Sequence, residues 1–146
     1  EKYNVLSRRE FRSRNEIYLE RYVKEINIES RLTLRIAKTM IFPSAVDYQN
    51  RLASAALALK SLGKEHCTTV LDELNGLLAK FQPAMAHLDA AIRHEAKGDT
   101  VEHARHALNK LIPAMQEVRK IADAVEQIVA DEQWPLPTYQ EMLFVK

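Results

Sequence analysis

Apolar residues recur at steps of three and four along most of the chain, which is the spacing that places side chains on one face of a helix. The longest such stretch covers residues 27–62, and Pro43 lies inside it without shifting the phase. An interior proline usually ends or kinks a helix, so we expect one kinked helix about 50 Å long. Its stripe consists of Leu34, Ala37, Ile41, Ala45, Tyr48, Leu52, Ala55, Leu59 and Leu62.

The same spacing predicts two more long helices, and Pro83 and Pro113 lie inside them without shifting the phase. Kinks at matching heights would let the three helices bend together; alternatively, each proline marks a local cavity or contact. The first stripe consists of Leu71, Leu74, Leu78, Phe81, Met85, Leu88 and Ile92, and the second of Val101, Ala104, Leu108, Leu111, Met115, Val118, Ala122, Val125 and Val129.

Turn and capping residues predict where these helices begin and end. Gly63 is placed to end the long helix, and either threonine of residues 68–69 can cap the next one. Gly98 is then expected to end that helix. Asp99 begins the last long helix, with Glu102 completing a capping box. A connection as short as Gly-Asp predicts an antiparallel hairpin.

Ser7 predicts the start of the first helix, because Glu10 three residues later completes another capping box. This helix runs to about residue 26. The junction at Asn27 is weak, since neither glycine nor proline enforces a break there. Helices one and two are therefore either continuous or bent. The apolar face of helix one consists of Phe11, Tyr18, Leu19, Tyr22, Val23 and Ile26.

Four arginines stand at the start of the first helix, namely Arg8, Arg9, Arg12 and Arg14. Cations in a first turn oppose the helix dipole, and nothing in the composition offsets that cost. They are candidate contacts to carboxylates elsewhere, with simple solvation as the commoner alternative.

The net charge of +1 gives no overall electrostatic case for binding nucleic acid or an anionic membrane. Charge is nevertheless uneven: residues 1–38 carry ten Lys or Arg and six Asp or Glu, whereas residues 117–146 carry three and six. Solvated faces of opposite sign explain this asymmetry, and a basic face for an acidic partner is the alternative. With the single Cys67 and no apolar run long enough to span a membrane, the cytoplasm is the expected location.

The last segment, residues 132–146, has a different character. Pro135 and Pro137 require an extended backbone, and Thr138 and Glu141 can cap one last helical turn. A disordered tail is normally polar, so this apolar one is expected to dock, either on the bundle or on a neighbouring domain. Its apolar residues are Trp134, Leu136, Tyr139, Met142, Leu143, Phe144 and Val145.

Together these features predict an all-α fold. We expect a single domain, residues 1–146, formed by an antiparallel bundle of about four helices with an extended apolar C-terminal tail. Three of the helices are long and contain a proline. The low glycine count of three and the apolar fraction of 47% agree with a folded, helix-rich chain.

Candidate chemistry is sparse. The best metal-ligating set lies around the hairpin expected at residues 98–99. It consists of His94, Glu95, Glu102, His103 and His106. His103 and His106 share one helix face, which suits a metal, but no Glu-x-x-His pair occurs. We favour the explanation that these histidines lie on the exposed side of the hairpin. We therefore assign no metal site and keep His94, His103 and His106 as candidates.

No catalytic constellation emerges either. Cys67 follows His66, but adjacent residues rarely meet in hydrogen-bonding geometry, so a nucleophile pair is discounted. There is no glycine-rich phosphate loop and no zinc-ligand spacing. We therefore predict no catalytic residue and no cofactor-binding residue in this chain.

Three blocks resemble the C-terminal helical region of type III glutamine synthetases. Residues 14–31 read RNEIYLERYVKEINIESR, residues 39–49 read TMIFPSAVDYQ, and residues 134–146 read WPLPTYQEMLFVK. They lie in family order and bracket nearly the whole chain. Between them, residues 60–130 resemble the family only in helical character.

The resemblance implies a parent enzyme that makes glutamine from glutamate, ammonia and ATP with a divalent metal, Mg or Mn. Those sites belong to the family's preceding catalytic domain, so this chain, which starts without methionine, is expected to be an inactive C-terminal fragment. Its expected partners are that catalytic domain and neighbouring subunits of a homo-oligomer. The alternative is a free-standing helical interaction module. The interface candidates are Arg8, Arg9, Arg12, Arg14, Trp134, Leu136, Tyr139 and Phe144.

Overall fold

The computed structural model of this chain describes residues 5–94, 98–137 and 139–143. Every regular element in these ranges is helical, which confirms the all-α prediction. In chain order the elements are α1 (Arg8–Ile36), the π-helical turn η1 (Ala37–Ile41), α2 (Phe42–Ser61), α3 (Thr69–Arg93), α4 (Thr100–His106), the π-helical turn η2 (Ala107–Leu111), α5 (Ile112–Glu126), the 3₁₀ turn η3 (Asp131–Gln133) and α6 (Tyr139–Leu143).

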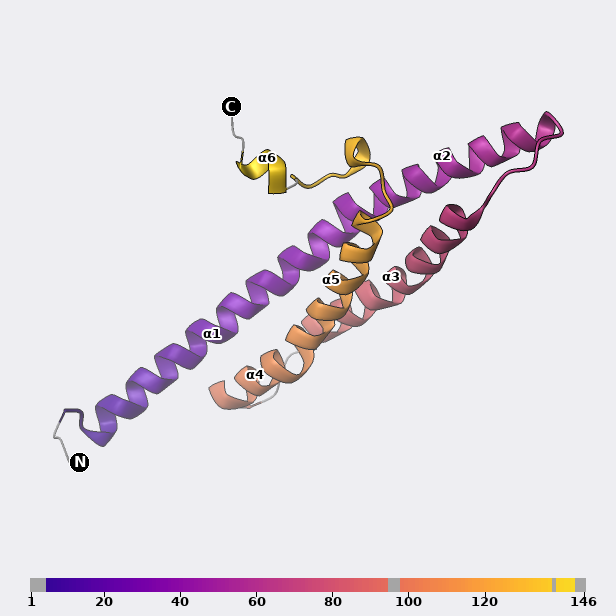
Figure 1. Cartoon of the computed structure of the whole chain (residues 1–146). Helices are drawn as coiled ribbons and strands as arrows, with labels where there is room; N and C mark the ends of the chain where they lie inside the picture. The colour runs from indigo at the N-terminus through magenta and orange to yellow at the C-terminus, as the bar shows by residue number, and fades with distance from the viewer. Residues whose placement is uncertain (1–4, 95–97, 138, 144–146) are drawn as a thin grey trace.

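The long helical segments form three rods. The first is α1–η1–α2, which is continuous, so the open question at Asn27 is answered: its side-chain amide donates to the carbonyl of Val23 at 2.8 Å within the helix. The second rod is α3 and the third is α4–η2–α5. Figure 1 shows α1 and α2 following one line, with α3 returning beside α2 and α5 crossing near the α1–α2 junction. The two predicted N-terminal helices are therefore one.

The predicted caps are largely confirmed. The Ser7 backbone N–H donates to the Glu10 carboxylate at 2.8 Å, and the Glu10 N–H donates to the Ser7 hydroxyl at 3.2 Å, which closes the capping box. Asp99 accepts the N–H groups of Val101 and Glu102. The Glu102 carboxylate pairs with Arg105 at 2.7 Å instead of completing the second box.

One helix end was predicted correctly and one was not. Gly63 ends α2 with φ of 68°, and the N–H of Lys64 reaches back to Leu59. The next helix, α3, ends at Arg93 rather than at Gly98. No large apolar side chain follows Ile92 before Gly98, so extending the helix would bury nothing.

Two of the three interior prolines follow a π-helical turn. The N–H of Phe42 bonds to the carbonyl of Ala37, and that of Ile112 bonds to Ala107, each five residues back. Proline lacks an N–H and clashes with the carbonyl four residues back, and a widened turn relieves that conflict. Pro83 lies within α3 itself. The predicted kinks at matching heights stay a prediction.

The core lies along the seam where α3 meets the other two rods, and most predicted stripe positions face it. Leu108 was predicted to be buried but is 56% exposed, and Ala107 takes its place. The π-helical turn widens the helix there, so the residue four positions before Leu111, rather than the one three positions before it, faces the core. Leu62 is also exposed, at the uncovered end of α2. The main cluster contains Ala37, Ile41, Ala45, Leu74, Leu78, Phe81, Ala84, Met85, Leu88, Ala114, Val118, Ala122, Val125 and Val129.

Polar contacts supplement this packing between the long rod and α3. The ammonium of Lys38 lies 2.9 Å from the carboxylate of Asp89, which also accepts from Arg93. The hydrogen bond from Lys38, followed by that from Arg93, lowers the pKa of Asp89 below its ordinary value. These contacts tie residues that are far apart in sequence.

Replacing Phe81 tests the position of the core. Its ring is fully buried and lies 6.3 Å from that of Phe42. Phe81→Ala should lower the free energy of unfolding by about 3–5 kcal/mol, because it removes a buried ring and leaves a cavity. Urea unfolding measures this. Phe11→Ala is the control, since Phe11 is 65% exposed, and its cost should stay within about 0.5 kcal/mol. Equal costs would contradict this assignment of the core.

Two glycine substitutions should have opposite effects. Gly63→Ala forces a side chain into positive φ and should cost about 1 kcal/mol. Gly76→Ala lies inside α3 with open space around the added methyl group, and should stabilise the chain by about 0.5–1 kcal/mol. Thermal unfolding of both variants checks the signs. Stabilisation by Gly63→Ala would show that α2 does not end as described.

The Asp89 contacts should make stability depend on pH. The folded state lowers the pKa of Asp89, so its contribution is present above the ordinary aspartate value and is lost as pH falls through and below about 4. Asp89→Asn should therefore lower Tm at pH 7, and the difference from the unsubstituted chain should shrink towards pH 3. Asp123→Asn is the control, because Asp123 is exposed and its ion pair with Arg119 is long, at 3.7 Å, so it should contribute little to stability. A Tm difference for Asp89→Asn that is independent of pH would rule out this electrostatic origin.

Candidate interface surfaces and histidine groove

The N-terminal part of α1 extends past the other rods. Figure 1 shows this part reaching beyond α4. Tyr22 and Ile26, further along α1, pack against the small second core cluster around Ala107. Phe11 and Tyr18 are 65% and 69% exposed, so the predicted core face of the first helix is wrong at these two positions. No other described element reaches them, and we call residues 8–18 the overhang.

The four predicted interface arginines, Arg8, Arg9, Arg12 and Arg14, all lie exposed on the overhang. Within the described ranges none of them forms an ion pair. Glu10 accepts hydrogen bonds from Ser7, which lower its pKa below the usual range, and the nearby charge of Arg14 adds to this effect. The overhang therefore combines exposed positive charge with exposed apolar side chains.

The first part of the predicted docking tail lies against the chain's own bundle. Trp134 and Leu136 are partly buried and pack on the main core cluster. The Ser44 hydroxyl donates to the carbonyl of Gln133. Glu132 pairs with Arg51, which raises the pKa of that guanidinium. The interface candidates Trp134 and Leu136 are thus used, at least in part, within this chain.

The second part of the tail is different. In α6, Met142 and Leu143 are exposed. The side chain of Tyr139 and the whole of Phe144 lie outside the described residues, so these two predicted interface positions are not placed. Two of the described side chains of α6, those of Met142 and Leu143, are thus apolar and open to solvent.

An apolar groove of about 590 Å³ runs between the long rod and α5. Leu32 and Ile36 line one side, Met115 lines the other, and Trp134 and Leu136 of the tail close one end. The rim carries both signs of charge. The groove is where the docked tail meets the two longer rods.

The three candidate histidines, which were kept as a possible metal-ligating set, line one groove. The rings of His94 and His106 lie 5.4 Å apart, and His106 Nε2 is 3.0 Å from the carbonyl of Ala91. A carbonyl only accepts, so Nε2 of His106 carries the proton. Within the described residues no three His, Cys, Asp or Glu side chains form a group that could hold a metal ion. Glu95 lies outside these residues, and Glu102 pairs with Arg105.

These histidines line a second groove, of about 730 Å³, between α1, α3 and α4. We call it the histidine groove. Its apolar and amide lining consists of Val23, Asn27, Ile28 and Ile92, and its basic lining of Lys24, Arg31, Arg93, His94, His103 and His106. Sequence reasoning missed the three non-histidine cations. The signal was the spacing of residues 24, 27, 28 and 31, which puts them on one face of α1.

Cys67 is exposed in the loop between α2 and α3. Its sulfur lies 3.0 Å from the Thr69 hydroxyl, and that hydrogen bond lowers the pKa of the thiol. The hydrogen-bond partner of the thiol is thus Thr69, two residues further along the chain. Among the described helices, none combines the length and the apolar character needed to cross a membrane.

Comparison with known proteins places the chain in a family. Residues 1–60 match the family model described as the glutamine synthetase C-terminal domain. A type-3 glutamine synthetase of Dictyostelium discoideum is 31% identical over 157 residues, covering 98% of this chain and 21% of that protein. A glutamine synthetase of Bacteroides fragilis (strain YCH46) is 28% identical over 151 residues, covering 97% of this chain and 21% of that protein.

A third relative, the glutamine synthetase of Butyrivibrio fibrisolvens, is 29% identical over 148 residues, covering 98% of this chain and 21% of that protein. The similarity is therefore not confined to the three blocks and runs through residues 60–130 as well. The chain spans about a fifth of the length of these relatives. It belongs to the glutamine synthetase C-terminal domain family, and its relatives include a type-3 enzyme.

Proposed function

We propose that this chain is the non-catalytic helical domain at the C-terminal end of a type-3 glutamine synthetase, and that it serves assembly through the overhang of α1. The proposed parent enzyme joins ammonia to glutamate at the expense of ATP. ATP, the divalent metal (Mg or Mn) and glutamate bind in its catalytic domain, and the enzyme is cytoplasmic. The alignment of nearly the whole chain with glutamine synthetases supports this proposal.

The observation that carries the assembly role is the exposed state of the overhang. Arg8 and Arg9 lie in the first turn of α1, where the helix dipole disfavours a cation by about 0.3–1 kcal/mol when nothing compensates it. Carboxylates on a partner surface would provide that compensation. Phe11 and Tyr18, on the same segment, gain by burial at about 25 cal/mol per Å² of apolar surface.

The partner in this proposal is an acidic surface of the preceding catalytic domain or of a neighbouring subunit. A rod that extends beyond its own bundle can reach such a surface without any change in the bundle. The exposed apolar residues Met142 and Leu143 of α6 offer a second contact of the same kind. Both surfaces lie outside the core, so losing them should leave the fold of the domain intact.

Neutralising the overhang tests the assembly role in the full-length protein. Replacing Arg8, Arg9, Arg12 and Arg14 together with glutamine should lower the assembled mass, the rate of glutamine formation, or both, because the partner's carboxylates lose their counter-charges. Light scattering measures the mass, and a glutamine assay measures the rate. The matched control removes four exposed arginines elsewhere: Arg21, Arg35, Arg105 and Arg119.

An unchanged mass and rate in the overhang variant would overturn the assembly role. An equal loss in the control variant would show that total charge, rather than the overhang, matters. Measurable glutamine formation by the 146-residue chain alone would contradict the division of labour between the two domains.

A further inference from the structure

We propose that the histidine groove binds a small polyanion and that phosphate groups are the chemistry it recognises. The groove lies at residues 23–31 of α1 and at the facing ends of α3 and α4. It includes no residue of the overhang. The inference therefore stands independently of the proposed assembly role.

All the described charged or ionisable side chains that line the groove are basic. Among its described residues six are lysine, arginine or histidine and none is acidic. Of these, Lys24 lies 3.7 Å from Glu20 and Arg93 is paired with Asp89, both carboxylates outside the lining. Arg31 forms no ion pair within the described ranges, so its guanidinium is an uncompensated permanent charge. Guanidinium groups bind phosphate oxygens through paired, charge-assisted hydrogen bonds. A concave surface with this lining attracts anions.

The imidazole rings of the groove lie close together and one of them is fixed by a hydrogen bond. The bond to the Ala91 carbonyl holds the ring of His106 in place, and His94 lies close to it. An anion bound beside the two rings would accept hydrogen bonds from their N–H groups. His103 adds a third ring from the same helix as His106. The three rings thus supply donors to a ligand that brings several negative oxygens.

The groove has the size of a small-molecule site, and its basic lining does not suit a metal cation. A volume of about 730 Å³ lies in the range of small-molecule sites and is far larger than one metal ion requires. Lys24, Arg31 and Arg93 would also repel a metal cation. Ile28 and Ile92 provide apolar walls, so the groove can hold the body of a phosphorylated compound as well as its phosphates.

Calorimetric titration of the 146-residue chain with pyrophosphate tests the proposal. Binding should saturate at one equivalent. Arg31→Gln should weaken it by about tenfold or more, because it removes the permanent charge that no carboxylate offsets. Arg35→Gln is the matched control: it removes the same charge from an exposed position one turn along α1, outside the groove, and should change the affinity by less than about twofold.

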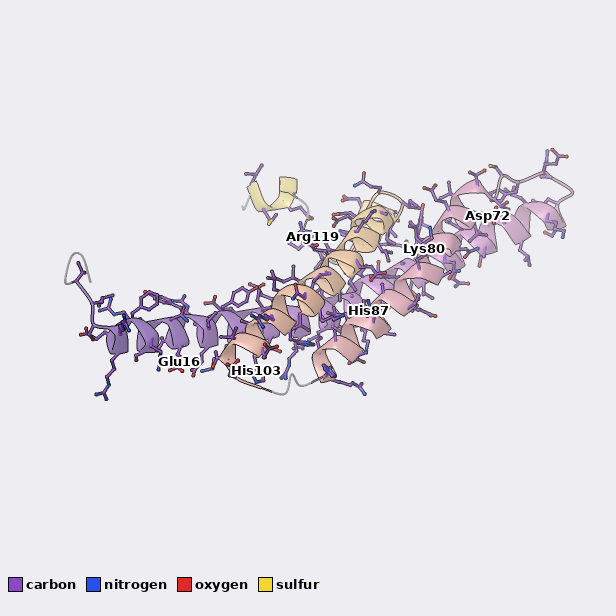
Figure 2. The ribbon with its side chains drawn as sticks, turned by 90° about the horizontal axis from the view of Figure 1, so that it is seen from below. Glu16, Asp72, Lys80, His87, His103 and Arg119 are labelled. Atoms are coloured by element: carbon purple, nitrogen blue, oxygen red, sulfur yellow. The ribbon has the colours of Figure 1, made fainter. Side chains whose placement is uncertain are left out.

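Nuclear magnetic resonance provides a second readout. Pyrophosphate should shift the ring signals of His94, His103 and His106 with a single saturation curve. His66 and His87 should not shift, since neither lines the groove. Figure 2 shows His87 on α3 and His103 on α4 at different points along the bundle. A urea midpoint for Arg31→Gln within error of the unsubstituted chain would show that the variant is folded.

Several outcomes would overturn the proposal. Equal weakening by Arg31→Gln and Arg35→Gln would mean diffuse attraction to a basic surface. Changes in the ring signals of His87 equal to those of His103 would likewise indicate diffuse attraction rather than a defined site. Binding of an acidic peptide such as oligoglutamate, without binding of pyrophosphate, would identify the groove as a protein contact.

Discussion

The burial of α3 between the two longer rods is the interaction on which the rest of the structure depends. Leu74, Phe81 and Leu88 of α3 have no exposed surface, and they are three of the four fully buried leucine and phenylalanine side chains among the described residues. Small residues face them from the neighbouring rods, including Ala45 and Ala114. Small side chains let the helix backbones approach closely, so large residues from one rod fill the space between the others.

This arrangement explains why the prolines are tolerated. Pro43 and Pro113 lie on the exposed side of their rods, each two positions after a buried residue, Ile41 and Leu111. The π-helical turns absorb the lost hydrogen bond while those buried residues keep their place in the core. A proline facing the seam would have disrupted the packing that holds the bundle together.

The same arrangement leaves surfaces uncovered. The rod α1–η1–α2 is longer than either of its partners, so its N-terminal turns cannot be buried within the chain. The overhang, with Phe11 and Arg12, is the direct result of that mismatch. The histidine groove begins where the overhang ends, because there the last turn of α3 and the first turns of α4 meet α1. Both surfaces follow from the lengths of the helices.

The sequence by itself determined the helices, their caps at Ser7, Gly63 and Asp99, and most of the buried stripe, because these depend on neighbours a few residues apart. It also carried the family resemblance. Only the tertiary structure decided which apolar faces find a partner: Tyr18 and Tyr22 have the same pattern in the sequence, yet only Tyr22 lies under another helix. Likewise, the histidines could be identified from the sequence, but their meeting with Arg31 could not, since that depends on how three rods pack over distances that local periodicity does not encode.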